Sequence, residues 1–371
     1  MLTEQDELGI YHVLRRLRGR IRHIKLSLPP PILHNVLVLM DENFPILEHL
    51  ALSRLFSVDC PPLTLPKGFL APNLLHLDLF EIGLSKRLRV FTSTVSLVTL
   101  ALRRIQSYSD FRPRLLVARL RSLPLLEELT ISFPTLISHL STERELLGET
   151  GAPITLPSLK ILTFRGVGAY YLESLVAQIR VPLLERLYIL PLNQIAFALP
   201  HLCYLINITE AFKLPTAMVH FNCNMVGLSF HHDGFHLGAP FLLSVMCGPV
   251  DRQIDFAAQI CHALIPTLSG VRTLLLSYRE ISTEMRNGPN GVVNATTWHD
   301  LLRTFIGVKK LHIYHGLMEE VSHALQVDEV ASDPSFLPKL RSICAKRNLF
   351  TSFIYTRQVM YRPVQFKVVS E

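Results

Sequence analysis

Aliphatic residues recur along the chain at a fixed spacing. In the full pattern, a proline is followed by aliphatic residues two, five and seven positions later, and the residue between the last two is mostly polar or small. Clear examples are FPILEHLAL from Phe44, APNLLHLDL from Ala71, LPLLEELTI from Leu123, LPSLKILTF from Leu156 and VPLLERLYI from Val181, with weaker fits at LPHLCYLIN from Leu199 and LPKLRSICA from Leu337. The spacing without the proline is found at Ile21-Ile24-Leu26, Leu97-Leu100-Leu102, Met225-Leu228-Phe230, Val271-Leu274-Leu276 and Val308-Leu311-Ile313.

Counted from the proline position, the units begin at 19, 45, 72, 95, 124, 157, 182, 200, 223, 269, 306 and 338. Most steps are between 23 and 33 residues, close to the period of leucine-rich repeats, which is about 20–29 residues. The longer step from 223 to 269 indicates a degenerate unit or an insertion.

Each unit is predicted to contain a short strand, because its last two aliphatic residues alternate with polar ones, as in Leu77-Asp78-Leu79. The proline precedes the strand, where its missing N–H costs no sheet hydrogen bond. Segments of helical period lie between the strands at 114–121, 172–179, 256–264 and 297–305, the last with Thr296 or Thr297 as N-cap. One strand and one helix cannot bury a core, so neighbouring units must stack. The predicted fold is an α/β leucine-rich-repeat solenoid with a curved parallel sheet on the concave side and return helices outside.

The predicted organisation has three parts. Residues 1–20 form an N-terminal capping helix, centred on Gln5–Arg18. Residues 21–345 form the solenoid, with irregular units around 230–305, and residues 346–371 form a C-terminal cap or tail.

Two C-terminal stretches, TTWHDLLRTFIGVKKLHI from Thr296 and LPKLRSICAKRNLFTSFIYTRQVMYRPVQF from Leu337, carry a resemblance together with the repeats. The chain resembles the leucine-rich-repeat region of the F-box proteins that are expanded in mushroom-forming fungi. The resemblance implies a receptor that presents protein targets to a cullin-type ubiquitin ligase, docked through an N-terminal F-box to the ligase adaptor. The residues before the first repeat lack the F-box pattern, so the expected alternatives are a chain whose F-box lies upstream and a free-standing repeat scaffold.

Composition and charge narrow the class further. Hydrophobic residues make up 49% and charged residues 18%, which excludes a disordered tail. Six cysteines are too few for a disulfide scaffold, and the net charge of +7 does not by itself imply a polyanionic partner. The acidic start, MLTEQDEL, differs from a signal peptide, which predicts a cytoplasmic or nuclear protein.

The stretch 187–209 carries no acidic or basic residue and is long enough to span a bilayer. Two prolines and several polar residues interrupt it, however. We therefore expect a buried stretch of the repeats and no membrane association.

The polar residues of the predicted strands should line the concave face and bind a protein partner, because they mix acids, bases and aromatic groups. Tyrosine and arginine are typical anchors of such surfaces. The candidate protein-binding residues are His76, Asp78, Arg103, Glu128, Arg165, Arg186, Tyr188, Lys310, His312 and Tyr314.

Two histidine-containing segments could suggest chemistry. His231, His232, Asp233 and His236 could bind a metal and support a metal-dependent hydrolase, but the spacing typical of zinc sites is missing. We favour an exposed loop after a strand. In Trp298-His299-Asp300 the adjacent side chains would point to different faces of a helix, so a buried tryptophan anchor is favoured.

The remaining chemistry is sparse. The cysteines, at 60, 203, 223, 247, 261 and 344, form no metal or redox motif and are expected in the core. The basic run Arg15–Lys25 could contact phosphates, yet interleaved aliphatic residues favour a solvated cap over a nucleic-acid site. No nucleotide or hydrolase motif occurs in the sequence, so we expect no catalytic residue, no metal, no cofactor and no enzyme activity.

Overall fold

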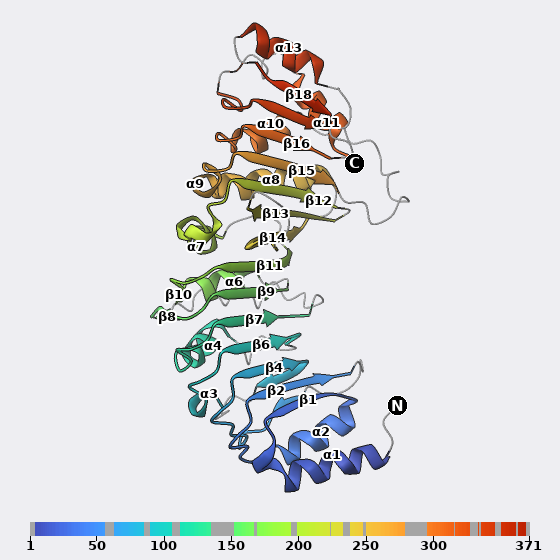
Figure 1. The fold of residues 1–371 in the computed structure, drawn as a ribbon, viewed down its shortest axis with the longest axis vertical. Helices are drawn as coiled ribbons and strands as arrows, with labels where there is room; N and C mark the ends of the chain where they lie inside the picture. Colours follow the sequence, from blue (N-terminus) through green and yellow to red (C-terminus); the bar gives the residue numbers. More distant parts are fainter. Residues whose placement is uncertain are drawn as a thin grey trace. The chain divides into compact units, whose positions relative to one another are not determined.

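The structure is a computed structural model that describes residues 4–55, 63–84, 90–105, 112–134, 152–166, 169–193, 199–222, 224–232, 238–247, 250–278, 295–314, 316–326, 333, 335–345, 350–360 and 363–368. The chain divides into two compact units, Met1–Leu184 and Glu185–Glu371. Each unit is a mixed α/β structure built on an open, mostly parallel sheet (Figure 1).

The sheet of the first unit is parallel, with the strand order β1-β2-β4-β6-β7-β9. These strands are β1 (His23–Leu28), β2 (His49–Arg54), β4 (His76–Phe80), β6 (Thr99–Arg103), β7 (Glu128–Ser132) and β9 (Ile161–Arg165). Two short parallel pairs accompany the sheet: β3 (Leu63–Leu65) with β5 (Ile82–Leu84), and β8 (Ile154–Thr155) with β10 (Ile179–Arg180).

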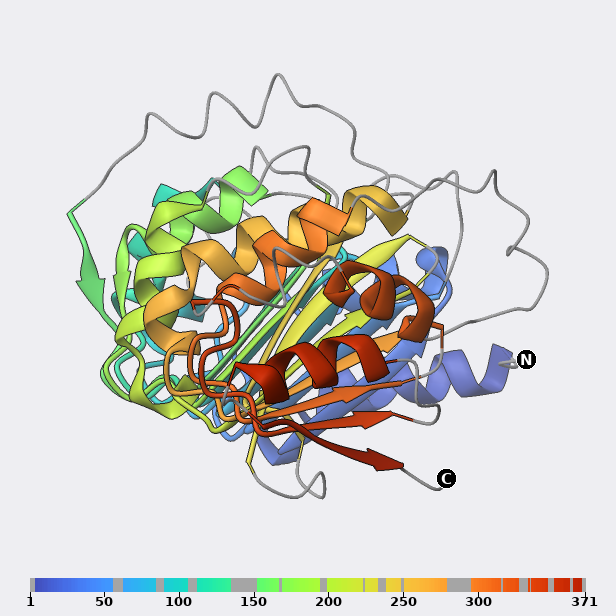
Figure 2. The same ribbon diagram turned by 90° about the horizontal axis from the view of Figure 1, so that it is seen from above.

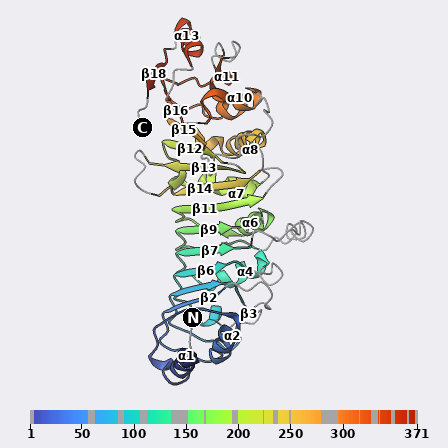
Figure 3. The ribbon, with the colours of Figure 1, turned by 90° about the vertical axis from the view of Figure 1, so that its right-hand side faces the viewer.

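Helix α1 (Glu4–Arg16) and the 3-10 helix η1 (Arg18–Arg20) precede β1. The later helices connect successive strands and cover one face of the sheet, as Figure 3 shows for α2, α4 and α6. These helices are α2 (Pro30–Leu39), α3 (Val90–Ser93), α4 (Pro113–Leu120) and α6 (Ala169–Val176). Proline begins both α2 and α4, where its fixed φ suits the first helical turn. The predicted helices at the N-terminus, at 114–121 and at 172–179 are confirmed within a few residues.

The repeat spacing predicts the register of this sheet residue for residue. Residues that hold the same place in successive units are paired across neighbouring strands, as Leu50 is with Leu77 and Leu77 with Leu100. All three leucines are at most 1% exposed. The core of the first unit is therefore a stack of aliphatic rows between the sheet and its helices.

The second unit keeps the strand order β11-β14-β13-β12-β15-β16-β17-β18. The strands are β11 (Arg186–Asn193), β12 (Thr216–Phe221), β13 (Met225–His231), β14 (Phe241–Met246), β15 (Thr273–Tyr278), β16 (Lys310–Ile313), β17 (Ser342–Ala345) and β18 (Gln365–Val368). Strand β13 is antiparallel to both of its neighbours, β12 and β14. The helices of the second unit are α7 (Pro200–Ile208), the 3-10 helix η4 (Glu210–Phe212), α8 (Val250–Ala263), α9 (Ile265–Leu268), α10 (Ala295–Arg303), α11 (Met318–Leu325) and α13 (Thr351–Val359).

Two predicted repeat units of this region are wrong. The segment from Leu199 forms helix α7, because Pro200 begins a helix and its three-residue aliphatic spacing suits one helical face as well as a repeat. The unit at 223 is the antiparallel strand β13. Strand β12 is parallel to β15, and its residues Ala217 and Val219, with Leu214 before the strand, carry the same aliphatic spacing and are buried.

Two further expectations concern helices. The predicted helices at 256–264 and 297–305 are α8 and α10, but α10 already begins at Ala295, so neither Thr296 nor Thr297 precedes it as a cap. The apolar stretch 187–209 forms part of β11 and helix α7 on either side of residues outside the description. Among the described residues, every helix is too short or too polar to cross a bilayer.

Candidate protein-recognition surface

The side chains on the strands of the first unit alternate between the two faces of the sheet. In β2, β4 and β7, buried residues alternate with half-buried or exposed ones, and the buried set packs toward the helices. The opposite set forms what we call the open face. In the described part of the first unit, the helices that follow β1, β6 and β9 lie on the other side of the sheet (Figures 2 and 3). The predicted separation of aliphatic and polar faces is therefore confirmed there.

An ion pair between Asp78 and Arg103 lies on the open face. The two side chains come from neighbouring strands, and Nη2 of Arg103 lies 3.4 Å from Oδ2 of Asp78. Asp78 is paired in register with Ala51 on one side and Ala101 on the other. Burial raises the pKa of the Asp78 carboxyl, although the positive charges of Arg103 and Lys25 act in the opposite direction.

The small side chains of Ala51, Ser27 and Ser53 leave a hollow beside this carboxylate. The hollow has a volume of about 170 Å³, and its lining includes Lys25, Phe80, Asp78 and Arg103. It combines an acid, two bases and an aromatic ring with small neighbours. This arrangement can accept one or two side chains of a protein ligand, with Phe80 as an apolar contact and the charged groups as hydrogen-bonding partners.

Three other candidate residues of the first unit lie on separate parts of the sheet. His76 stacks on His49, with ring centroids 4.3 Å apart, and its Nδ1 lies 3.1 Å from the hydroxyl of Thr99. Glu128 begins β7 and Arg165 ends β9, so these two exposed residues occupy opposite ends of neighbouring strands. The structure thus places His76 next to the ion pair of Asp78 and Arg103 on the open face. Glu128 and Arg165 lie away from this ion pair and from each other.

In the second unit, Arg186 and Tyr188 lie on β11 and line a wider hollow of about 530 Å³. Glu185, Glu210 and His232 also line it. This hollow contains acids and bases beside an aromatic ring, as the smaller one in the first unit does. The two predicted residues, Arg186 and Tyr188, therefore line the same hollow of the second unit.

Lys310, His312 and Tyr314 form the third group. Lys310 and His312 are on β16, and the exposed Tyr314 follows it, donating its backbone N–H to the carbonyl oxygen of Leu276 at 2.9 Å. Burial, and to a lesser extent the charge of Lys310, lowers the pKa of His312. Its imidazole is therefore neutral at neutral pH.

The histidine-rich segment at 231–236 falls only partly within the description. His231 ends β13 and is half-buried, with Nε2 at 2.9 Å from the hydroxyl of Ser229, so the expected exposed loop does not include it. Burial lowers its pKa. Asp233 and His236 lie outside the described residues, and the hydrolase interpretation stays a prediction without support from geometry.

The segment Trp298-His299-Asp300 is confirmed as a structural anchor. Trp298 is fully buried and packs edge-on against Phe221, with ring centroids 5.8 Å apart. His299 is also buried, and its Nε2 lies 2.6 Å from the carbonyl oxygen of Ala324. Asp300 is exposed on the outside of the helix.

The described cysteines lack the properties of nucleophiles. Cys203, Cys261 and Cys344 are buried as expected, while Cys247 is only half-buried. Burial raises the pKa of Cys247 to about 11 and raises that of Cys261 further. A thiol with a raised pKa is protonated at neutral pH and unreactive. Residues 60 and 223 lie outside the description.

The basic run at 15–25 is partly neutralised by the next repeat. Arg18 contacts Glu42 at 3.1 Å, and Arg22 contacts Glu48 at 3.0 Å. Both carboxylates follow β1 in the chain. These ion pairs reduce the charge available to a polyanion and favour the interpretation as a cap.

Sequence reasoning missed several residues of the open face. Lys25 and Phe80 line the smaller hollow, and His23 and His49 extend the row of His76. The signal was present: all three histidines stand four positions after the proline position in the units that begin at 19, 45 and 72. Comparing the same place in successive units would have found them.

No family model matches the chain, and the search of curated proteins finds no significant match.

Proposed function

We propose that the chain is a leucine-rich-repeat protein whose open face binds a protein partner without catalysing a reaction. The observation that carries this proposal is the mixed chemistry of a sheet face that the described helices leave uncovered, with Asp78, Arg103 and Phe80 around one hollow. Aromatic and arginine side chains at concave places are the usual anchors of protein interfaces. The thiols of Cys247 and Cys261, with their raised pKa values, are poor nucleophiles at neutral pH.

The chain resembles fungal F-box proteins, and this resemblance implies that it acts as a substrate receptor of a cullin-type ligase. The partner bound on the open face would then be a target for ubiquitylation. The adaptor subunit of that ligase is the direct test. Binding of the purified chain, alone or extended by any upstream coding sequence, would support the receptor role. Failure of both forms to bind would leave a free-standing recognition scaffold.

The recognition face itself can be tested separately. A photo-crosslinking amino acid is placed at Thr130, on the open face, and in a second variant at Arg114, exposed on α4. We expect the Thr130 variant to capture a recurrent protein from the source cells and the Arg114 variant to miss it. Capture of the same protein only from the helix side would refute the proposed face.

A further inference from the structure

Three histidines form a continuous stack across the first strands of the first unit. His23, His49 and His76 are paired in register on β1, β2 and β4. The ring centroids of His23 and His49 are 4.4 Å apart with planes 17° from parallel, and those of His49 and His76 are 4.3 Å apart at 11°. Parallel pairing places equivalent residues on adjacent strands, so one repeat position gives a column of imidazoles.

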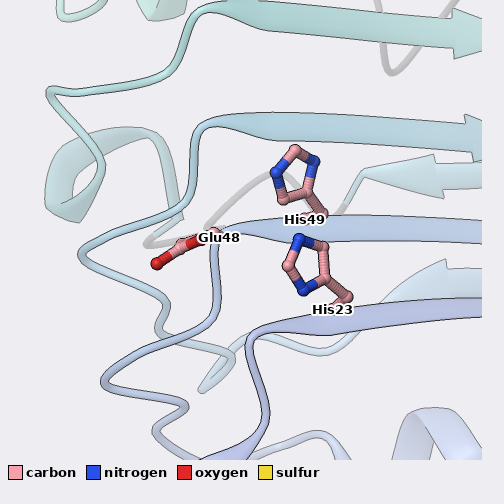
Figure 4. A group of neighbouring side chains, drawn as sticks. All are labelled: His23, Glu48 and His49. Atoms are coloured by element: carbon pink, nitrogen blue, oxygen red, sulfur yellow. The ribbon is translucent and has the colours of Figure 1, made fainter.

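A carboxylate stands beside this column. Glu48 precedes His49 at the turn that enters β2, and Figure 4 shows it with the two stacked rings of His23 and His49. One possible ligand atom from each of these three residues lies within 4.8 Å of the others. Donors bound tetrahedrally to one zinc ion at 2.0–2.2 Å are about 3.3–3.6 Å apart, so the side chains must move together by about 1 Å, which small rotations about their side-chain bonds provide.

Backbone hydrogen bonds hold the segment that carries Glu48 and His49 next to β1. The N–H groups of Glu48 and His49 both donate to the carbonyl oxygen of Arg22, at 2.8 and 3.0 Å. The guanidinium of Arg22 also donates to Oε1 of Glu48 at 3.0 Å. The carboxylate is thus held near the rings by a cation that a metal ion would have to displace.

Imidazole binds a metal through a neutral ring nitrogen. The Nδ1 of His76 lies 3.1 Å from the hydroxyl of Thr99, and this contact fixes the orientation of the His76 ring that stacks on His49.

We propose that His23, His49 and Glu48 bind a divalent transition-metal ion of the zinc type at the amino ends of β1 and β2. Two imidazoles and one carboxylate are a donor set that zinc accepts, and they leave its fourth position open to water or to an outside donor. His76 stacks behind His49 and positions its ring. This proposal is independent of the protein-recognition role.

The test is calorimetric titration of the full chain with Zn²⁺ alone. We expect one equivalent that binds more tightly than the background from other surface histidines. His23→Gln and His49→Gln should each weaken that site at least tenfold, and Glu48→Gln should weaken it about threefold or more, in line with losses seen when metal-site groups are removed. His34→Gln, which changes an exposed histidine on α2, is the matched control and should leave the site unchanged.

The substitution Arg22→Gln should change the Zn²⁺ affinity in the opposite direction, and a gain in affinity cannot result from loss of folding. Removing the competing guanidinium should free Glu48 and tighten Zn²⁺ binding about threefold. Thermal unfolding without metal checks that each variant is folded. Wild-type Zn²⁺ affinity in both His23→Gln and His49→Gln, or weaker binding in Arg22→Gln, would overturn the proposal.

Discussion

Leu187 and Tyr188 are adjacent residues on β11 that meet opposite environments, and they provide a matched pair of substitutions. Leu187 is 0% exposed and paired in register with the buried Phe241. Tyr188 is half-buried and lines the hollow of the second unit. We expect Leu187→Asp to unfold this unit and Tyr188→Asp to leave it folded.

The magnitude follows from two costs. Removing a buried leucine side chain costs about 2–5 kcal/mol, and burying a carboxylate without a partner adds several kcal/mol. Together they approach the whole stability of an ordinary domain, about 5–15 kcal/mol. Tyr188→Asp loses partial packing and some strand propensity, about 1 kcal/mol.

The measurement is urea unfolding followed by circular dichroism, with both variants compared with the wild-type chain. The Leu187→Asp variant should recover partly at pH 5, because protonation removes the buried charge. A Leu187→Asp variant as stable as the wild type would refute the assignment of this position to the core. Equal destabilisation by Tyr188→Asp would refute the alternation of faces.

Three further outcomes are expected in the second unit. Arg357→Met should lower the free energy of unfolding by about 2 kcal/mol, since the buried guanidinium donates to the carbonyl oxygen of Phe336; unchanged urea unfolding would contradict this. Gly307→Ala should cost about 1–3 kcal/mol, because a Cβ there would meet backbone carbonyl oxygens at 2.5 and 2.7 Å; a melting temperature equal to that of the wild type would exclude it. The folded-state pKa values of His231 and His312 are lowered, so the unfolded chain takes up protons first and stability should fall between pH 7 and pH 5. Thermal unfolding at both pH values checks this, and His312→Gln should reduce the difference.

The register of the first unit could be predicted from the sequence because proline and three aliphatic positions mark each unit independently. Asp78, for example, holds the same place as Ala51 and Ala101, and the structure pairs them. The interior demands an aliphatic residue at the positions on either side of this row, such as Leu77 and Leu79, whatever the partner is. The open face follows by alternation alone, which is why its residues were predictable as a set.

The second unit was less predictable because one aliphatic spacing serves two structures. Leu202 and Leu205, three residues apart, can face the core from a helix or from a repeat turn, and Pro200 is compatible with both. Met225, Leu228 and Phe230 keep the spacing on an antiparallel strand, since spacing carries no information about strand direction. The direction of β13 follows from its short connection to β12, which ends at Phe221 while β13 begins at Met225, because a parallel crossover needs about a dozen residues or more.

The hollow and the histidine column can be predicted only by comparing equivalent positions in successive repeat units. The hollow arises where small side chains of neighbouring units, Ala51, Ser27 and Ser53, lie beside larger ones such as Phe80 and Arg103. The column arises where one residue type repeats. Neither is visible within a unit, because each depends on side chains that are more than twenty residues apart in sequence.

Parallel, in-register pairing also limits which residues a repeat position can hold. Neighbouring strands lie about 4.8 Å apart, where two like charges repel by about 1 kcal/mol even at the dielectric constant of water. The row Lys25, Ala51, Asp78, Ala101 meets this limit because it places no like charges on neighbouring strands. A row of histidines meets it differently, because neutral rings stack without repulsion and ionise only at a cost. Burial, and then the rings on both sides, lower the pKa of His49 in the middle of its row, so substitution by lysine there should destabilise the unit more than substitution by glutamine. A metal ion reverses the balance, since it binds two neighbouring rings at once and makes their closeness favourable.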